Sequence, residues 1–100
     1  MLVRIGNAAD VAAGQMRVFD ITGLKVAVAN AGGQLYAFDD TCPHRGCSLA
    51  MGKLEGTTVT CPCHGSQFDV TSGAVLRGPA ARPVRTRPVQ IEEDGLLVES

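Results

Sequence analysis

The positions of the cysteine and histidine residues constrain this chain more than any other feature. The sequence has four cysteines and two histidines, and all six lie between positions 42 and 64. They form two short groups, CPHRGC at residues 42–47 and CPCHGS at residues 61–66. Core cysteines and surface histidines would be scattered, whereas thiolates and imidazoles gathered in two loops are typical of a metal site.

Each group places a cysteine shortly before a histidine. The first group has the spacing C-x-H and the second has C-x-x-H. Two such loops at the ends of neighbouring β-hairpins can hold a cluster between them. Each loop then gives one thiolate to one iron and one imidazole to the other, as in a 2Fe-2S centre where two histidines replace two cysteines.

Other interpretations of these residues stay open at this point. A zinc site with the same four ligands is one, although the usual zinc finger has a C-x-x-C pair and two histidines on a helix. A thioredoxin-like redox site is another, but Cys61-Pro62-Cys63 is C-x-C and no alternation of strands and helices surrounds it. A purely structural set of cysteines would not account for histidines that occur only in these groups.

The rest of the sequence predicts an all-β protein. Its 100 residues suffice for one domain, and 45% hydrophobic residues with a net charge of −1 exclude a disordered chain. Short alternating segments between glycine turns predict strands at 2–5, 15–21, 24–29, 35–38, 57–60, 67–70, 74–76, 89–92 and 96–99. Residues 7–13 favour one helical turn, an edge strand is expected before residue 88, and the periodicity fails over 39–56.

Composition also bears on partners and location. The near-neutral charge gives no electrostatic case for nucleic acid, and no apolar run approaches the ~18 residues of a membrane span. The first residues, MLVRIGNAADVAAG, lack the features of a secretion signal. We therefore expect a cytoplasmic protein, a monomer, that binds neither nucleic acid nor membrane.

The two groups closely resemble the paired sequence boxes of the Rieske iron–sulfur family. The resemblance continues through Gln67-Phe68-Asp69, Gly73 and Gly78-Pro79-Ala80, and it covers essentially the whole chain. It implies a Rieske-type antiparallel β-sandwich with a cluster-binding subdomain of two hairpins. We expect a single Rieske domain over residues 1–100, with a basal sheet at about 1–39 and 83–100 and the subdomain at about 40–82.

The resemblance also implies a ligand set for one 2Fe-2S cluster per chain. Two cysteines would bind the buried iron and two histidines the outer iron. These ligands are Cys42 and Cys61, and His44 and His64. The remaining pair, Cys47 and Cys63, matches positions that form a disulfide in the Rieske proteins of cytochrome bc complexes and that many oxygenase ferredoxins lack. A Rieske fold without its cluster is a further alternative, although all four ligands are present.

Five further residues are expected to contact or tune the cluster: Gly46, Gly65, Ser66, Phe68 and Pro79. The glycines let the backbone pass close to the cluster and direct N–H groups at its sulfurs. The resemblance implies that the Ser66 hydroxyl donates to a bridging sulfide and that Pro79 belongs to a covering loop. Phe68 stands where high-potential members carry a tyrosine, which phenylalanine cannot replace as a donor. We expect an intermediate potential within the range of about −150 to +300 mV.

The resemblance implies a one-electron carrier rather than an enzyme. A ferredoxin of this kind passes electrons from a flavoprotein or ferredoxin reductase to a terminal oxygenase of Rieske type. The alternative is a Rieske subunit of a larger oxidoreductase, of the arsenite oxidase, nitrite reductase or cytochrome bc kind, which the extra cysteine pair keeps open. Arg45 departs from the apolar residue usual in cytochrome bc proteins, which puts quinol oxidation in doubt.

A basic stretch follows the second group, with arginines at positions 77, 82, 85 and 87. One interpretation is a solvated edge strand, since most charge runs are exposed. The other is an electrostatic guide for an acidic partner.

Overall fold

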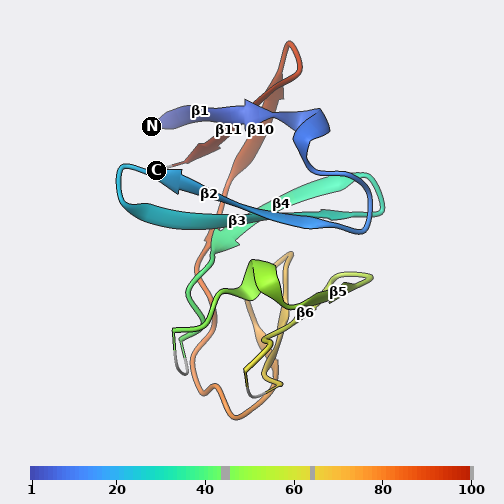
Figure 1. Cartoon of the computed structure of the whole chain (residues 1–100), viewed down its shortest axis with the longest axis vertical. Helices are drawn as coiled ribbons and strands as arrows, with labels where there is room; N and C mark the ends of the chain where they lie inside the picture. Colours follow the sequence, from blue (N-terminus) through green and yellow to red (C-terminus); the bar gives the residue numbers. More distant parts are fainter. Residues whose placement is uncertain (44–45, 64, 100) are drawn as a thin grey trace.

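Three antiparallel sheets make up the part of the chain that the structure describes (Figure 1). The computed structural model describes residues 1–43, 46–63 and 65–99. The first sheet has the order β1 (Leu2–Asn7), β11 (Gly95–Glu99), β10 (Val89–Glu92), and the second β2 (Met16–Ile21), β3 (Leu24–Ala31), β4 (Gln34–Asp39), β9 (Thr86–Arg87). The third has the order β5 (Lys53–Glu55), β6 (Thr58–Thr60), β7 (Gln67–Asp69), β8 (Val75–Arg77). The predicted antiparallel all-β fold is confirmed.

Helical structure in the described ranges amounts to two single 3-10 turns, η1 (Ala8–Asp10) and η2 (Leu49–Met51). The first lies inside the segment expected to form one helical turn. None of the helices in this part of the chain is long and apolar enough to cross a membrane.

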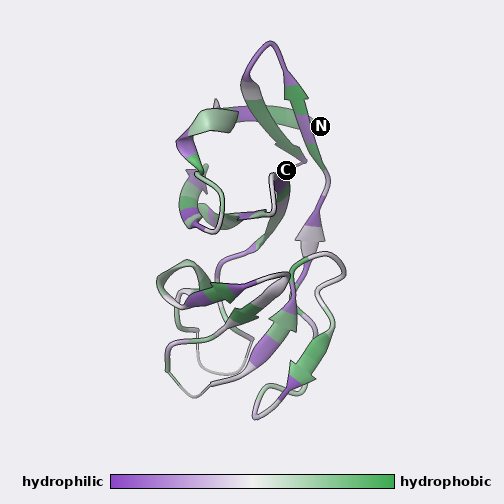
Figure 2. Ribbon diagram, turned by 90° about the vertical axis from the view of Figure 1, so that its right-hand side faces the viewer, coloured by the Kyte–Doolittle hydropathy of each residue, from purple (hydrophilic) through white to green (hydrophobic). Residues whose placement is uncertain are grey.

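The second sheet is a middle layer because β3 is buried on both faces. Val26 and Val28 pack in one core with Leu96 of β11, while Ala27 and Ala29 belong to the core on the other side. Successive side chains of a strand point to opposite faces, so one apolar run can serve two layers. Figure 2 shows the third sheet as a separate layer below the other two.

The second core lies between the middle sheet and the third sheet. Phe38 of β4, Phe68 of β7 and Leu49 of η2 are fully buried there. Cys42 and Cys61 belong to the same core. The packing that attaches the third sheet therefore also fixes the beginning of both predicted ligand loops.

The sequence does not predict β5, which lies in the stretch where periodicity fails. Its three residues include one half-buried apolar side chain, Leu54, and they are held as a strand by antiparallel pairing with β6. Gly52 permits the approach, because a Cβ there would collide with the Thr60 carbonyl oxygen. Strand formation here depends on a tertiary contact, which the local pattern does not contain.

The interpretation of the basic stretch as a solvated edge strand holds for the exposed Arg77, Arg82 and Arg85 but not for Arg87. Strand β9 does lie at the edge of the middle sheet, but Arg87 is only 7% exposed. Its Nε donates to Asp39 Oδ1 at 2.8 Å and its Nη1 donates to the Glu99 carbonyl at 3.4 Å. Arg87 thus joins the middle sheet to the first sheet.

Candidate metal centre

The first predicted ligand loop is closed by two backbone hydrogen bonds. The Cys42 N–H donates to the Cys47 carbonyl at 2.9 Å, and the Gly46 N–H donates to the Cys42 carbonyl at 2.8 Å. The loop follows β4 directly and begins in the second core. It therefore projects from a rigid base.

The second ligand loop repeats this arrangement between β6 and β7. The Cys61 N–H donates to the Ser66 carbonyl at 2.8 Å, and the Gly65 N–H donates to the Cys61 carbonyl at 3.2 Å. Cys61 thus occupies the position that Cys42 occupies in the first loop. The two cysteines are equivalent because they make the same backbone hydrogen bonds, although the cysteine-to-histidine spacing differs between the loops.

The two loop glycines have the same backbone conformation and make equivalent hydrogen bonds. Gly46 and Gly65 both have φ of 78°, in the left-handed region where a side chain is strained. Their N–H groups donate to the carbonyls of Cys42 and Cys61. That the glycines contact the cluster, and that backbone N–H groups of these loops point at its sulfurs, stay predictions.

Two buried thiols occupy the equivalent loop positions. Cys42 is 1% exposed and Cys61 is 3% exposed, and neither forms a disulfide. Thiolates are the ligands that iron–sulfur clusters use, and burial excludes water from them. These two residues therefore fit the predicted ligands of the buried iron.

The predicted ligands of the outer iron, His44 and His64, lie outside the described residues, as does Arg45. Among the residues that the structure describes, no group of three or more histidine, cysteine, aspartate or glutamate side chains is placed to hold a metal ion. The histidine ligands stay a prediction from the sequence.

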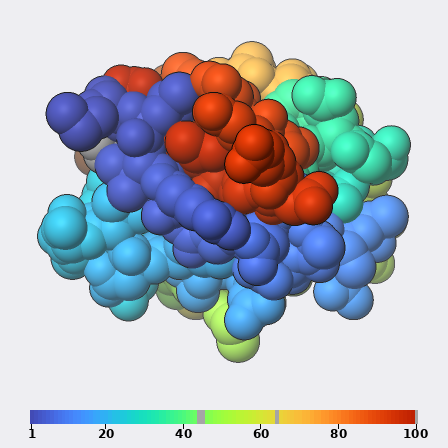
Figure 3. Space-filling model, turned by 90° about the horizontal axis from the view of Figure 1, so that it is seen from above, coloured from blue at the N-terminus to red at the C-terminus, as the bar shows by residue number. Residues whose placement is uncertain are grey.

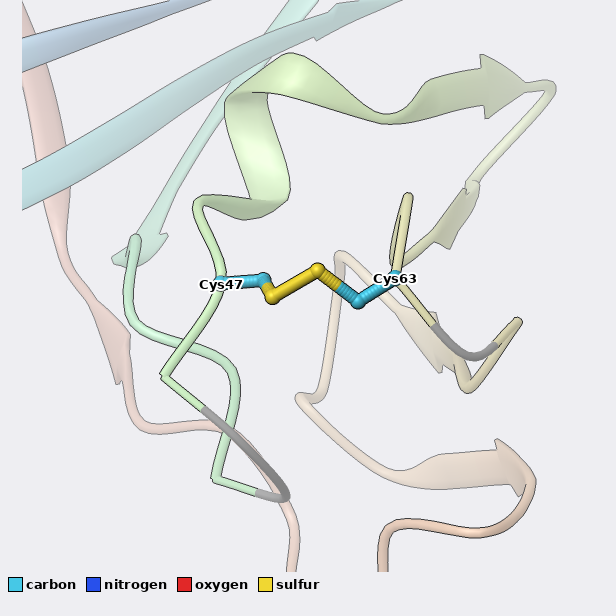
Figure 4. Close-up of a disulfide and its surroundings, with 2 residues drawn as sticks. All are labelled: Cys47 and Cys63. Atoms are coloured by element: carbon cyan, nitrogen blue, oxygen red, sulfur yellow. A yellow bond between two sulfur atoms is a disulfide. The ribbon is translucent and has the colours of Figure 1, made fainter.

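Cys47 and Cys63 form the predicted disulfide (Figure 4). The bond joins the end of the first loop to the second loop, with the two Cα atoms 6.5 Å apart. It takes two of the four cysteines out of competition for metal. The thiols of Cys42 and Cys61 are the two that it leaves.

Ser66, the last residue of the second loop, and Phe68, just after it in β7, are completely buried. The Ser66 Oγ accepts the Ala80 N–H at 3.0 Å, so it holds the segment around Pro79 against the loop. Pro79 itself is exposed and follows a cis peptide bond. Phe68 pairs with Val59 across β6 and β7 and belongs to the second core.

Asp40, just before the first loop, binds the start of η2, just after it, and the residue pattern does not predict this role. Its carboxylate is buried, with Oδ1 accepting the Ala50 N–H at 2.9 Å, while its carbonyl accepts the Leu49 N–H at 2.8 Å. These are N–H groups at the start of η2, which need acceptors from outside the helix. An aspartate at the end of a strand, just before an irregular segment, is the signal that could have indicated this role.

The last residue of β7, Asp69, carries a second stabilised carboxylate, which accepts hydrogen bonds from the turn to β8. The Thr71 hydroxyl donates to Asp69 Oδ1 at 2.6 Å and the Thr71 N–H donates to the same oxygen at 2.8 Å. These bonds, the hydroxyl first, lower the pKa of Asp69 below its usual value because they stabilise the charged form. The turn carries Gly73, where a Cβ would collide with the Val84 carbonyl oxygen.

The antiparallel sheets, the two equivalent loops and their buried thiols fit an iron–sulfur protein. The family description Rieske [2Fe-2S] domain matches residues 1–88, and the chain belongs to this family. Membership implies a 2Fe-2S cluster, which replaces the zinc interpretation. The thioredoxin-like interpretation is wrong, because every described sheet is antiparallel.

Solved structures of Rieske-type ferredoxins share the fold over nearly the whole chain. The Sphingomonas yanoikuyae B1 ferredoxin has 30% identity and a TM-score of 0.94, covering 100% of this chain and 99% of that one. The ferredoxin of carbazole 1,9a-dioxygenase from Nocardioides aromaticivorans IC177 has 31% identity and a TM-score of 0.92, covering 98% and 96%. A chain in the complex of reduced oxygenase and oxidized ferredoxin in carbazole 1,9a-dioxygenase has 33% identity and a TM-score of 0.92, covering 97% and 91%.

Curated relatives match over a shorter segment. The cytochrome b6-f complex iron-sulfur subunit of Prochlorococcus marinus (strain AS9601) is 51% identical over 37 residues, which is 37% of this chain and 20% of that protein. The subunit of strain MIT 9301 gives the same values. The match thus spans about a fifth of the length of these relatives.

Proposed function

We propose that this protein is a one-electron carrier with one Rieske-type 2Fe-2S cluster per chain. In this role it is the ferredoxin component that accepts electrons from a flavoprotein or ferredoxin reductase and passes them to a Rieske-type oxygenase. The observation that carries the proposal is the similarity to solved ferredoxins, which extends over both chains almost completely.

The residues of the chain have separate tasks in this function. Cys42 and Cys61, together with His44 and His64, would hold the cluster. When bound, the cluster accepts and releases single electrons. The disulfide and the hydrogen-bonded loops would keep these ligands in place, and the segment held by the Ser66–Ala80 contact would cover the cluster on a third side. A rigid and dry site undergoes little rearrangement when its charge changes.

A subunit of a larger oxidoreductase is the second candidate function. Two observations favour it: the disulfide, and the 51% identity to cytochrome b6-f subunits over 37 residues. The ferredoxin proposal has the stronger support, because the curated match is confined to about a third of this chain. In either case the protein transfers electrons and the catalytic step belongs to a partner.

One experiment separates the two candidates. The purified protein is mixed with NADPH and a flavoprotein reductase, and then with a Rieske-type oxygenase, while its visible absorption is followed in a stopped-flow instrument. Reduction by the first and reoxidation by the second, with a free protein on a size-exclusion column, supports the ferredoxin. A stoichiometric complex that survives purification from the native host supports the subunit instead.

Three further predictions from the sequence accompany this proposal. They are a single Rieske domain divided into a basal part at about 1–39 and 83–100 and a cluster-binding subdomain at about 40–82, a monomeric state, and a cytoplasmic location. The topology supports the division, because β5 to β8 form a sheet of their own.

A further inference from the structure

A groove of about 280 Å³ lies beside the first ligand loop. One wall belongs to that loop and the strand before it, and the other belongs to the segment after Pro79. The lining residues are Asp39, Thr41, Pro43, Arg82, Pro83, Val84 and Arg85. The groove therefore adjoins the end of the molecule where the candidate metal centre lies, and its two arginines are exposed.

The acidic side chain of the groove is already neutralised. Asp39 accepts a hydrogen bond from Arg87 Nε at 2.8 Å, and the side chain of Arg87 is only 5% exposed. The two opposite charges cancel, so this partly buried pair adds little net charge to the surface. The charge that the groove presents to solvent is that of Arg82 and Arg85.

The two arginines are available to an external partner. Among the residues that the structure describes, no carboxylate forms an ion pair with Arg82 or Arg85. Val84, between them, is buried and its N–H donates to the Gly73 carbonyl at 2.9 Å. The backbone that carries both arginines is thus anchored, while their guanidinium groups remain solvated.

The opposite end of the molecule is acidic. Glu92, Glu93 and Asp94 are exposed at the tip of the β10–β11 hairpin. The Ala8 N–H donates to the Asp94 carbonyl at 2.9 Å, which brings the exposed Asp10 of η1 to the same end. Seen from above, the N-terminal segment and this hairpin lie side by side (Figure 3).

These charges are separated along the longest dimension of the molecule, which is 39 Å. In Figure 1 the hairpin is at the top and the orange loop that follows β8 is at the bottom, from where the chain rises to β9 beside the middle sheet. Because this dimension exceeds the Debye length of about 10 Å at 0.1 M salt, charges at the two ends are largely screened from each other. A charge asymmetry of this kind orients the protein during encounter.

We propose that the groove beside the first ligand loop docks an acidic surface of the electron-transfer partner. Carboxylates of that partner pair with Arg82 and Arg85, and the acidic hairpin end is turned away from it. The inference rests on the proposed electron-carrier function, and it adds the chemistry of the partner surface. Anionic docking beside the candidate centre brings the partner close to the site of electron exit.

The binding test uses a hexaglutamate peptide with the purified protein at about 20 mM ionic strength. We expect amide shifts in NMR spectra at Thr41, Arg82 and Arg85, and affinity roughly fivefold weaker in the Arg82→Gln/Arg85→Gln variant. The control Arg4→Gln/Arg17→Gln removes the same charge elsewhere and should change affinity less than about twofold. Equal weakening in both variants, or shifts confined to other surfaces, would overturn the proposal.

A second binding arm identifies the class of partner. A hexathymidine oligonucleotide that binds the same residues more tightly than the peptide would replace the acidic protein with a nucleic acid. These binding measurements need no redox chemistry, so they test the docking surface separately from the proposed electron-carrier function. A protein without a cluster that still binds the peptide refutes only the proposed function, whereas a working ferredoxin that ignores the peptide refutes only the docking surface.

A redox arm connects the groove to electron transfer. One electron passes from the reduced protein to ferricyanide, giving ferrocyanide, or to the cationic tris(phenanthroline)cobalt(III), giving the cobalt(II) complex. We expect the Arg82→Gln/Arg85→Gln variant to react about threefold more slowly with ferricyanide and no more slowly with the cobalt complex. Equal slowing with both oxidants would contradict docking by charge at the groove.

Discussion

The hydroxyl oxygen of Ser66 accepts the backbone N–H of Ala80 at 3.0 Å, and this bond joins the second ligand loop to the segment around Pro79. Both residues are buried. Because a serine hydroxyl also has one hydrogen to donate, this arrangement leaves its hydrogen for another acceptor. Ser66 can thus hold the covering segment and still serve in the predicted bond to a bridging sulfide.

Replacing Ser66 with alanine tests both parts of this role. The Ser66→Ala variant leaves the buried Ala80 N–H without its acceptor, so we expect a loss of about 1–3 kcal/mol in the free energy of unfolding. We also expect a lower reduction potential in protein-film voltammetry, because a donor to the cluster is removed.

Ser72 supplies the matched control for this variant. Its exposed Oγ accepts the Ala74 N–H at 3.2 Å in the β7–β8 turn. Since the site is solvated, Ser72→Ala should cost no more than about 0.5 kcal/mol and leave the potential unchanged. Equal effects of the two substitutions would show that the Ser66 contact has no special role.

The disulfide is expected to stabilise the loop pair. It connects residues 16 positions apart, and closing a loop of about 15 residues contributes about 3 kcal/mol in the chain-entropy description. The Cys47→Ser/Cys63→Ser variant should therefore have a lower denaturation midpoint and lose its visible absorption faster in the presence of an iron chelator. The wild-type protein after reduction of the bond by a phosphine should behave like the variant.

An unchanged midpoint in that variant would contradict the stabilising role. Thiol alkylation followed by mass spectrometry gives an independent check. Under denaturing, non-reducing conditions the metal-free protein should expose two alkylatable cysteines, Cys42 and Cys61, because the other two are bonded.

The ion pair between Arg87 and Asp39 predicts a large difference between neighbouring arginines. Arg87→Met removes the buried partner and leaves the Asp39 carboxylate, whose side chain is 28% exposed, without compensation. We expect a loss of about 2–3 kcal/mol in unfolding experiments, less than for a fully buried pair because water reaches the carboxylate. The exposed Arg85→Met should stay within about 0.5 kcal/mol.

The double variant Arg87→Met/Asp39→Asn distinguishes an ion pair from simple packing. Neutralising the remaining carboxylate should recover part of the lost stability, because an uncompensated charge is removed. If the stability losses of Arg87→Met and Asp39→Asn simply add in the double variant, Arg87 acts only through the packing of its side chain.

The depressed pKa of Asp69 predicts a specific acid response. Its carboxylate contributes stability above the ordinary value of about 3.9, and that contribution is lost as the pH falls through the lower pKa of the folded state. Thr71→Val removes the hydroxyl donor, so the pKa of Asp69 should rise and less stability should be lost on acidification. Carbon-detected NMR titration of the side-chain carboxyl measures the pKa directly.

Asp20 is the internal reference in the same titration. Its pKa is also lowered, first by the Gly23 N–H and then by the Lys25 side chain, and neither is changed by Thr71→Val. An Asp69 that titrates near 3.9 in the unmodified protein would refute the proposed stabilisation.

The residue types and their spacing are enough to predict the two ligand loops, but they do not predict the contacts that hold these loops in the fold. Cys42 and Cys61 are predicted as equivalent ligands, and the structure places them at equivalent, buried positions. The hairpins could also be predicted, because their alternating strands and turn residues are local signals. Few folds can bring six cysteine and histidine residues together within 23 positions of sequence.

Long-range contacts account for the rest. Strand β5 forms because β6 is beside it, and Arg87 is buried because Asp39, 48 residues earlier, is within reach. A charge run in a sequence is most often exposed, so nothing near Arg87 distinguishes it from Arg85. The same holds for Asp40, whose partners at the start of η2 become neighbours only in the folded chain.

The composition of the bound metal tests the central claim most directly. The purified protein should contain about two irons and two acid-labile sulfides per chain, and one-electron reduction of the coloured protein should produce the paramagnetic resonance signal of a mixed-valence 2Fe-2S cluster with histidine ligands. A colourless protein that contains zinc, or a cluster whose iron is bound by cysteine alone, would contradict the assignment of the two loops as a Rieske centre.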